Sequence, residues 1–133
     1  MIPLYAVICE HQRAGQAGTI DLLGIFDRIA VPNVPAQHRG ATFVVQIVTD
    51  DEADLGKHDF VVRIIRPTGK PLLEQRAVFQ LRPEGGSWLA AGRLAFEFHG
   101  LLLPDLGKYL FSLDVDGTPF ARYAMTVVQA PAK

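Results

Sequence analysis

Acidic side chains gather at two points of the sequence, and together they could hold a metal ion. The candidate ligands are Asp50, Asp51, Asp54, Asp114 and Asp116. Calcium binds about six to eight oxygen atoms, which carboxylates on two neighbouring loops can supply. The spacing of these residues matches no dedicated calcium loop, and two of them have ordinary alternative roles. Asp116 would serve a turn, and Asp50 would cap a short helix.

The single cysteine and the four histidines are a second source of metal ligands. Cys9 and His11 would share one face of a strand, but a closed zinc site needs two further ligands and none is adjacent. The histidines show neither HxH nor HxxxH spacing. We therefore interpret Cys9 as a buried structural residue and His38, in a loop flanked by prolines, as a loop anchor. No cofactor is predicted.

Side chains suited to nucleophilic or acid–base catalysis are few. Ser87 lies in Gly86-Ser87-Trp88-Leu89, which lacks the last glycine and the following helix of a nucleophile elbow. Glu97 with a second carboxylate could form a glycosidase pair, but basic residues alternate with the acidic ones on the same predicted strands. We therefore predict no catalytic residue and no enzyme activity. A small hydrolase acting on a carbohydrate or an ester is kept as the second alternative.

Trp88 is the one tryptophan of the chain, and it follows a connection that contains proline and glycine. A large aromatic side chain on a loop can anchor a protein interface or stack on a sugar ring. It can also fold back over the edge of the core. Trp88 is therefore a candidate interaction residue with a structural alternative.

Composition limits the class of protein. The chain has 133 residues, which fits one domain over 1–133, and 49% of them are hydrophobic. Thirteen Lys and Arg against fourteen Asp and Glu give a net charge of -1, with no basic stripe for a nucleic acid. The N-terminal residues do not resemble a secretory signal, and no apolar run approaches the ~20 residues of a membrane span. We expect a cytoplasmic protein with neither nucleic-acid partner nor membrane span.

Turn-forming residues divide the chain into segments of strand length that are rich in Val, Ile, Leu and Phe. The predicted strands are Leu4–Glu10, Ile20–Ile29, Thr42–Thr49, Asp59–Arg66, Leu72–Arg82, Leu89–His99, Lys108–Asp116 and Pro119–Gln129. Period-2 alternation is clearest in Lys108–Asp116, and Asp116-Gly117 then predicts a tight hairpin turn. Gly24 predicts a bulge or a close backbone approach. The pattern predicts an all-β, two-sheet antiparallel sandwich of about eight strands, with at most one short helical turn near 50–56.

The run from Leu103 to Tyr109 resembles the tyrosine corner of immunoglobulin-like sandwiches, in which a tyrosine hydroxyl bonds back to the preceding turn. The resemblance implies structural roles for Tyr109 and Gly107, and the hairpin gives structural roles to Asp116 and Gly117. The cysteine and tryptophan that mark true antibody domains are absent.

Three blocks together resemble a family of small bacterial β-sandwich proteins of uncharacterised function. They are Tyr5–Glu10, then Leu22–Ile29 with Val34–His38, and finally Pro104–Gly117. Their order spans nearly the whole chain. The resemblance implies the fold but does not indicate any activity.

Several predicted strands carry apolar residues on both faces, for example Val44 and Val48 opposite Phe43 and Val45. A sandwich needs only one apolar face per sheet, so the surplus could bury a neighbour. The leading hypothesis is therefore a non-enzymatic binding or protein-interaction module that self-associates as a homo-oligomer or binds a protein partner. The first alternative is a calcium-binding module that resembles C2 domains.

Overall fold

The computed structural model describes residues 1–16, 19–84 and 86–131. Hydrophobic strands make up most of this structure. In this part of the chain there are nine strands: β1 (Ile2–Ala14), β2 (Ile20–Ile25), β3 (Arg28–Val31), β4 (Ala36–Thr49), β5 (Gly56–Ile65), β6 (Pro71–Leu81), β7 (Ala90–Leu103), β8 (Gly107–Val115) and β9 (Thr118–Gln129). The short 3-10 helix η2 (Glu52–Asp54) lies where the sequence predicts a helical turn, but its N-cap is Asp51 and not the predicted Asp50.

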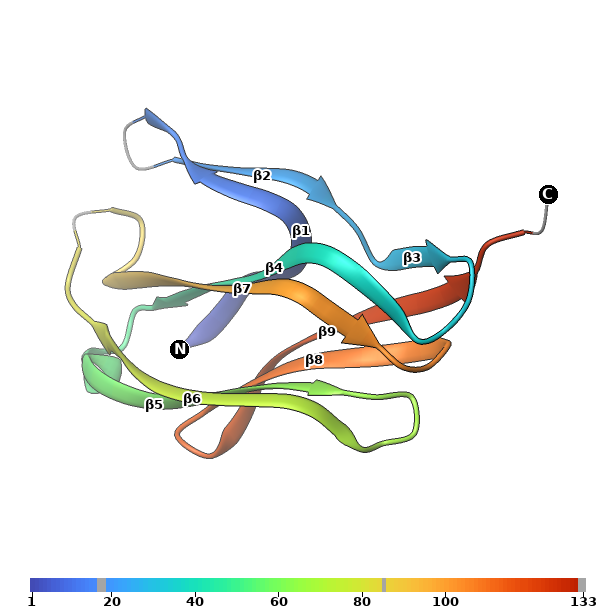
Figure 1. Ribbon diagram of the computed structural model, residues 1–133. Coiled ribbons are helices and arrows are strands. Elements are labelled where there is room, and N and C mark those ends of the chain that lie inside the picture. The colour runs from blue at the N-terminus through green and yellow to red at the C-terminus, as the bar shows by residue number, and fades with distance from the viewer. Residues whose placement is uncertain (17–18, 85, 132–133) are drawn as a thin grey trace.

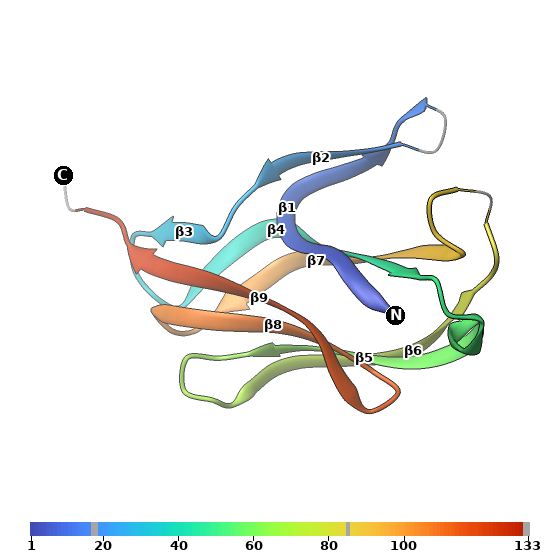
Figure 2. The same cartoon turned by 180° about the vertical axis from the view of Figure 1, so that it is seen from behind.

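The strands form two packed sheets (Figures 1 and 2). The four-stranded sheet has the order β2-β1-β4-β7, and the five-stranded sheet has the order β3-β9-β8-β5-β6. Every pairing is antiparallel except that of β3 with β9, which is parallel. The prediction of an all-β two-sheet sandwich is confirmed.

The segment Ile20–Ile29 differs from its prediction as one strand. It divides at Phe26-Asp27 into β2, which pairs with β1, and β3, which pairs with β9 of the other sheet. This change of sheet gives one strand more than the predicted eight. Gly24 has a φ of 68°, and a Cβ at this position would lie 2.9 Å from the Glu10 side chain. The close approach predicted for Gly24 is therefore present.

Aromatic side chains join the two sheets in the core. Phe43 of β4 is fully buried, and its ring centroid lies 5.7 Å from that of Phe111 on β8. Phe98 of β7 lies in the same sheet as Phe43, and its ring centroid is 5.9 Å from that of Phe111. From Tyr109 to Val115 of β8, buried and partly exposed residues alternate strictly, as the sequence predicts.

Tyr109 closes the corner before β8 with its hydroxyl. The Oη atom donates a hydrogen bond to the Asp105 carbonyl and accepts one from the Asp105 amide, each at 2.9 Å. Tyr109 is fully buried, so water cannot replace these bonds. At the next turn, Asp116 and Gly117 have φ values of 51° and 78°, which suit a two-residue hairpin.

Replacing Tyr109 by phenylalanine is expected to lower the free energy of unfolding by about 1–2 kcal/mol, because both backbone groups of Asp105 lose their partner. Urea denaturation measures this difference. Tyr5 provides a matched control, because its hydroxyl is buried and has no hydrogen-bond partner among the described residues. Tyr5→Phe should leave stability unchanged or raise it. Equal losses from both substitutions would contradict the role of the corner bonds.

Candidate functional site

The edge of β4 is left without a partner strand where β1 turns away. The last pair between these strands is Cys9 with Thr42, and beyond it β1 pairs only with β2, as far as Ala14. On its other side, β4 pairs with β7 from Ala36 onward. Within the described residues, the backbone of Ala36–Ala41 therefore has a strand on one side only. We call the other side the free edge of β4.

Alternation along the strands shows which backbone groups point to this free edge. The Ile8 carbonyl accepts a hydrogen bond from the Phe26 amide, so the backbone N–H and C=O groups of Ile8 point to β2. Those of the next residue, Cys9, point to β4. The backbone N–H and C=O groups of Thr42, the partner of Cys9, therefore point to β1. Two-residue periodicity then directs the N–H and C=O groups of His38 and Gly40 toward the free edge.

β3 forms a second free edge nearby. It pairs with β9 on one side, and the carbonyls of Asp27 and Val31 accept hydrogen bonds from Thr126 and Ala130. Since both polar groups of a residue in a parallel strand point to the same side, Arg28 and Ala30 direct theirs away from β9. Figure 1 shows β3 and β4 running in opposite directions on either side of their short connection.

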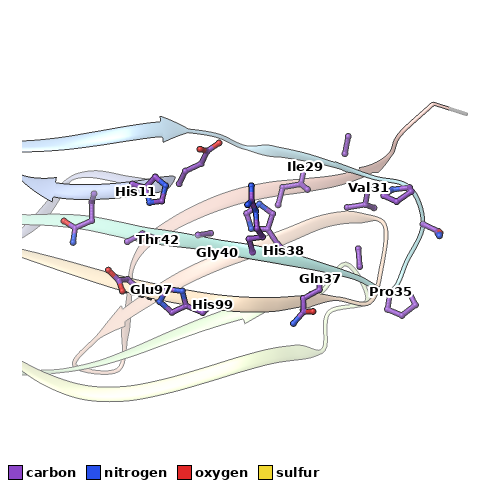
Figure 3. Close-up of a pocket in the computed structure, with 18 residues that line it drawn as sticks. His11, Ile29, Val31, Pro35, Gln37, His38, Gly40, Thr42, Glu97 and His99 are labelled. Atoms are coloured by element: carbon purple, nitrogen blue, oxygen red, sulfur yellow. Dashed lines mark ion pairs between the residues drawn. The ribbon is translucent and has the colours of Figure 1, made fainter. Parts of the chain in front are cut away.

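A cleft of about 840 Å³ lies along these strands (Figure 3). β1, β3, β4, β7 and the connection at 32–35 line it. Val31 of β3 and Ala41 of β4 belong to the hydrophobic core and also line the cleft. The cleft therefore extends from the surface down to the core between the edges of the two sheets.

Polar side chains from three strands surround the cleft. His11, His38 and His99 come from β1, β4 and β7 (Figure 3). His99 lies beside Glu97 of the same strand, with 3.5 Å between Nε2 and Oε2. All of these groups can form hydrogen bonds with a bound molecule.

His38 has the most unusual environment of the three, and its predicted place in a loop is wrong, because β4 begins at Ala36. Its ring centroid lies 5.7 Å from that of Phe26, and its Nδ1 atom is buried without a hydrogen-bond partner in the described part of the chain. Burial lowers the pKa of His38, while Glu10 raises it by a smaller amount. The ring is therefore held toward its neutral form.

Comparison with known proteins places the chain in a family. A family model described as a family of unknown function, DUF6941, matches residues 4–128. The chain belongs to the DUF6941 family. This confirms the resemblance of the whole chain to an uncharacterised family. No curated protein and no solved structure matches the chain.

The five acidic candidate ligands of the DUF6941 chain accept hydrogen bonds from different groups. The donors are the Leu89 amide for Asp50, the Ala53 amide for Asp51, Thr49 and the Met1 amine for Asp54, Arg63 for Asp114, and His58 with the Asp59 amide for Asp116. No three His, Cys, Asp or Glu residues of the described chain lie close enough together to hold a metal ion. Calcium binding gains no geometric support from this placement.

His58 joins two of these acidic segments. Its Nδ1 atom lies 2.6 Å from Asp116 Oδ2, and its Nε2 atom lies 2.6 Å from the Asp54 carbonyl oxygen. The ring also stacks on Phe79, with centroids 5.3 Å apart. An ionised carboxylate and a carbonyl both accept hydrogen bonds, so this arrangement favours the protonated ring, in which both nitrogens donate.

The remaining candidates lie apart from the cleft or below the surface. Cys9 is fully buried, and this burial raises the pKa of its thiol. Trp88 is partly buried in the connection between β6 and β7. Figure 1 shows that β6 and β7 are joined at the end of the sandwich away from β3. Its role as an interaction anchor stays a prediction. No helix among residues 1–16, 19–84 and 86–131 is long and apolar enough to cross a membrane.

The two free edges could not be predicted from the sequence, because strand pairing creates them. One local signal was available. Gly40 and the prolines at 32 and 35 interrupt the chain where the cleft forms, but such residues are typical of any turn.

Proposed function

We propose that this DUF6941 chain is a non-enzymatic protein-interaction module that binds an extended polypeptide segment in the cleft. The observation that carries the proposal is the free edge of β4, which adjoins the cleft along Ala36–Ala41. An extended segment can add to such an edge as a further strand, with main-chain hydrogen bonds for affinity. His38 and Gly40 supply the donors and acceptors.

The size and lining of the cleft support a bound segment. Binding clefts usually measure about 300–1,000 Å³ and combine apolar surface with a few polar groups. Here Val31 and Ala41 supply apolar contacts, and the histidines of β1, β4 and β7 supply polar ones. Neither Ser87 nor Ser112 lines the cleft, so a serine nucleophile does not act there.

Filling the cleft should prevent binding. Gly40 lines the cleft, and a Cβ at this position would have the Phe98 carbonyl oxygen at 3.4 Å as its nearest neighbour. Gly40→Leu should therefore keep the fold and fill part of the cleft. For peptides selected from a random display library against the natural chain, we expect it to weaken binding by about tenfold or more. Isothermal calorimetry measures the change.

Gly86→Leu is the matched control. Gly86 is exposed in the connection between β6 and β7, and a Cβ there has no neighbour within 4 Å. This variant should bind the selected peptides as the natural chain does. The proposal also requires that peptide binding protects the amides of Ala36–Ala41 from hydrogen exchange. Failure to select any peptide, or protection confined to other strands, would contradict it.

Self-association is the second part of the proposed function. Val44 and Val48 are only 0% and 1% exposed, so side chains of the same chain already cover these two. Leu23 and Ile25 of the edge strand β2 are 43% and 54% exposed. Exposed apolar residues on an edge strand favour pairing with a second copy.

Sedimentation velocity at micromolar concentration should accordingly show a reversible dimer. Ile25→Lys places a charge on the edge of β2 and should shift the protein to monomer. Leu106→Lys is a suitable control, because Leu106 is 41% exposed in the corner between β7 and β8 and belongs to no strand. A natural chain that sediments only as a monomer would refute self-association.

A further inference from the structure

We propose that the bound segment inserts between β4 and β3, antiparallel to β4 and parallel to β3, and so joins the edges of the two sheets. This inference rests on the proposed binding of an extended segment in the cleft. It adds a second edge, an orientation and a side-chain pattern for the ligand.

Both edges present backbone groups in the same cleft. Gly40 and His38 direct their N–H and C=O groups away from β7, and Ala30 directs its own away from β9. Residues of both strands line the cleft, and among the described residues β3 and β4 do not pair with each other. One inserted strand could bond to both.

The connection between the two strands also allows for an inserted strand. Neighbouring strands lie about 4.7–4.9 Å apart, so room for one additional strand requires a separation of about 9–10 Å. The tightest hairpins join paired strands with two residues, whereas residues 32–35 connect β3 to β4. An extended chain spans about 3.3–3.6 Å per residue, so this connection is long enough to pass around an inserted strand.

The directions of β1, β3 and β4 determine the direction of the inserted segment. β1 pairs antiparallel with β4 as far as Thr42, and a segment that follows the same edge continues the course that β1 leaves. Because β3 runs opposite to β4, the same segment is parallel to β3, as β9 is. Both existing sheet patterns are then preserved.

The two-residue period of a strand defines the ligand. Side chains on one face would meet the core residues Val31 and Ala41, and those on the other would meet the outward-facing Glu97 and His99. The ligand is therefore a segment with alternating apolar and polar side chains. Its insertion must separate the Phe26 ring from His38, which is a single contact between partly buried side chains.

A proline at position 30 tests the second edge. Ala30 is exposed, and its amide points away from β9, so Ala30→Pro should keep the β3–β9 pairing and remove one donor from the cleft. We expect selected peptides to bind roughly five- to tenfold more weakly. Ala30→Ser, which keeps the amide, should bind as the natural chain does. Unchanged binding by the folded proline variant would overturn insertion between the strands.

Hydrogen exchange separates this inference from the proposed function. Protection of both Ala36–Ala41 and Arg28–Val31 supports insertion. Protection of Ala36–Ala41 alone refutes the contact with β3 and leaves binding to β4 standing. If no selected peptide binds at this cleft, both proposals fail.

A spin label on Gln37→Cys tests the orientation, on a Cys9→Ala background that removes the native thiol. Gln37 lies near the start of β4 and lines the cleft. A segment antiparallel to β4 brings its carboxyl end to this label, so the carboxyl-terminal residues of an isotope-labelled peptide should show the stronger paramagnetic broadening. Stronger broadening of the amino-terminal residues would overturn the proposed direction.

Discussion

His58→Leu is expected to lower the free energy of unfolding by about 2–3 kcal/mol near pH 6. Hydrogen bonds to charged groups contribute about 1.5–3 kcal/mol each, and His58 makes two such contacts at 2.6 Å. The Asp116 side chain is 51% exposed, so water replaces part of what it loses. Leucine keeps an apolar contact with Phe79, which also limits the loss.

The pH dependence of stability distinguishes the charge of His58 from its packing. Burial acts to lower the pKa of His58, but the hydrogen bonds with Asp116 and the Asp54 carbonyl outweigh it, so the net effect is a raised pKa. The stabilisation is therefore complete below the unfolded value of about 6.5 and is lost as pH rises through the folded pKa.

Asp116 defines the acidic limit of the same stabilisation. The hydrogen bond with His58 lowers the pKa of Asp116, so its contribution is complete above the unfolded value of about 3.9. It is lost as pH falls through the folded pKa. Together the pair stabilises the fold fully between about pH 4 and 6.5.

Urea denaturation at a series of pH values measures this profile. The natural chain should lose stability as pH rises above about 6.5, and His58→Leu should lose much less over the same range. His99→Leu is the matched control, because the His99 side chain is 80% exposed and lies 3.5 Å from Glu97. It should keep the natural profile. Identical pH profiles for the natural chain and His58→Leu would show that His58 is not the titrating group.

The features of this fold that can be predicted from the sequence are local ones. The alternation of Tyr109, Phe111, Leu113 and Val115 determines which face of β8 is buried, whichever strands pair with it. The Asp116-Gly117 turn needs only two residues that tolerate positive φ. The same reasoning places Tyr109 next to the turn that its hydroxyl contacts, because donor and acceptor are four residues apart.

The candidate site depends on pairings between distant segments, which no local pattern contains. The free edge of β4 arises because β1 exchanges one partner for another at Cys9. The cation at His58 needs Asp116, which is 58 residues away, so a spacing rule for histidines could not identify it. The division of Ile20–Ile29 between two sheets likewise follows from tertiary packing, since the whole segment is suited to a strand.

The largest loss of stability among these variants is expected for Phe43→Ala, at about 3–5 kcal/mol, the usual range for truncating a fully buried phenylalanine. Phe43 is fully buried between the sheets, and its ring contacts Phe96 at 6.1 Å and Phe111 at 5.7 Å. Truncation leaves a cavity that the rigid strands on both sides cannot close. Urea denaturation followed by circular dichroism measures the loss.

A double-mutant cycle of Phe43→Leu with Phe111→Leu tests whether the edge-to-face contact contributes beyond area burial. Such aromatic pairs contribute about 0.5–1.5 kcal/mol. The sum of the two single-variant losses should therefore exceed the loss in the double variant by that amount. Val78→Ala is the surface control, because Val78 is 59% exposed and its truncation should change stability by less than about 0.5 kcal/mol. Strict additivity in the cycle would attribute the role of Phe43 to volume alone. A loss below about 1 kcal/mol for Phe43→Ala would show that this part of the core can collapse around the missing ring. The Phe43 ring would then not hold β4, the strand with the free edge, in a rigid position.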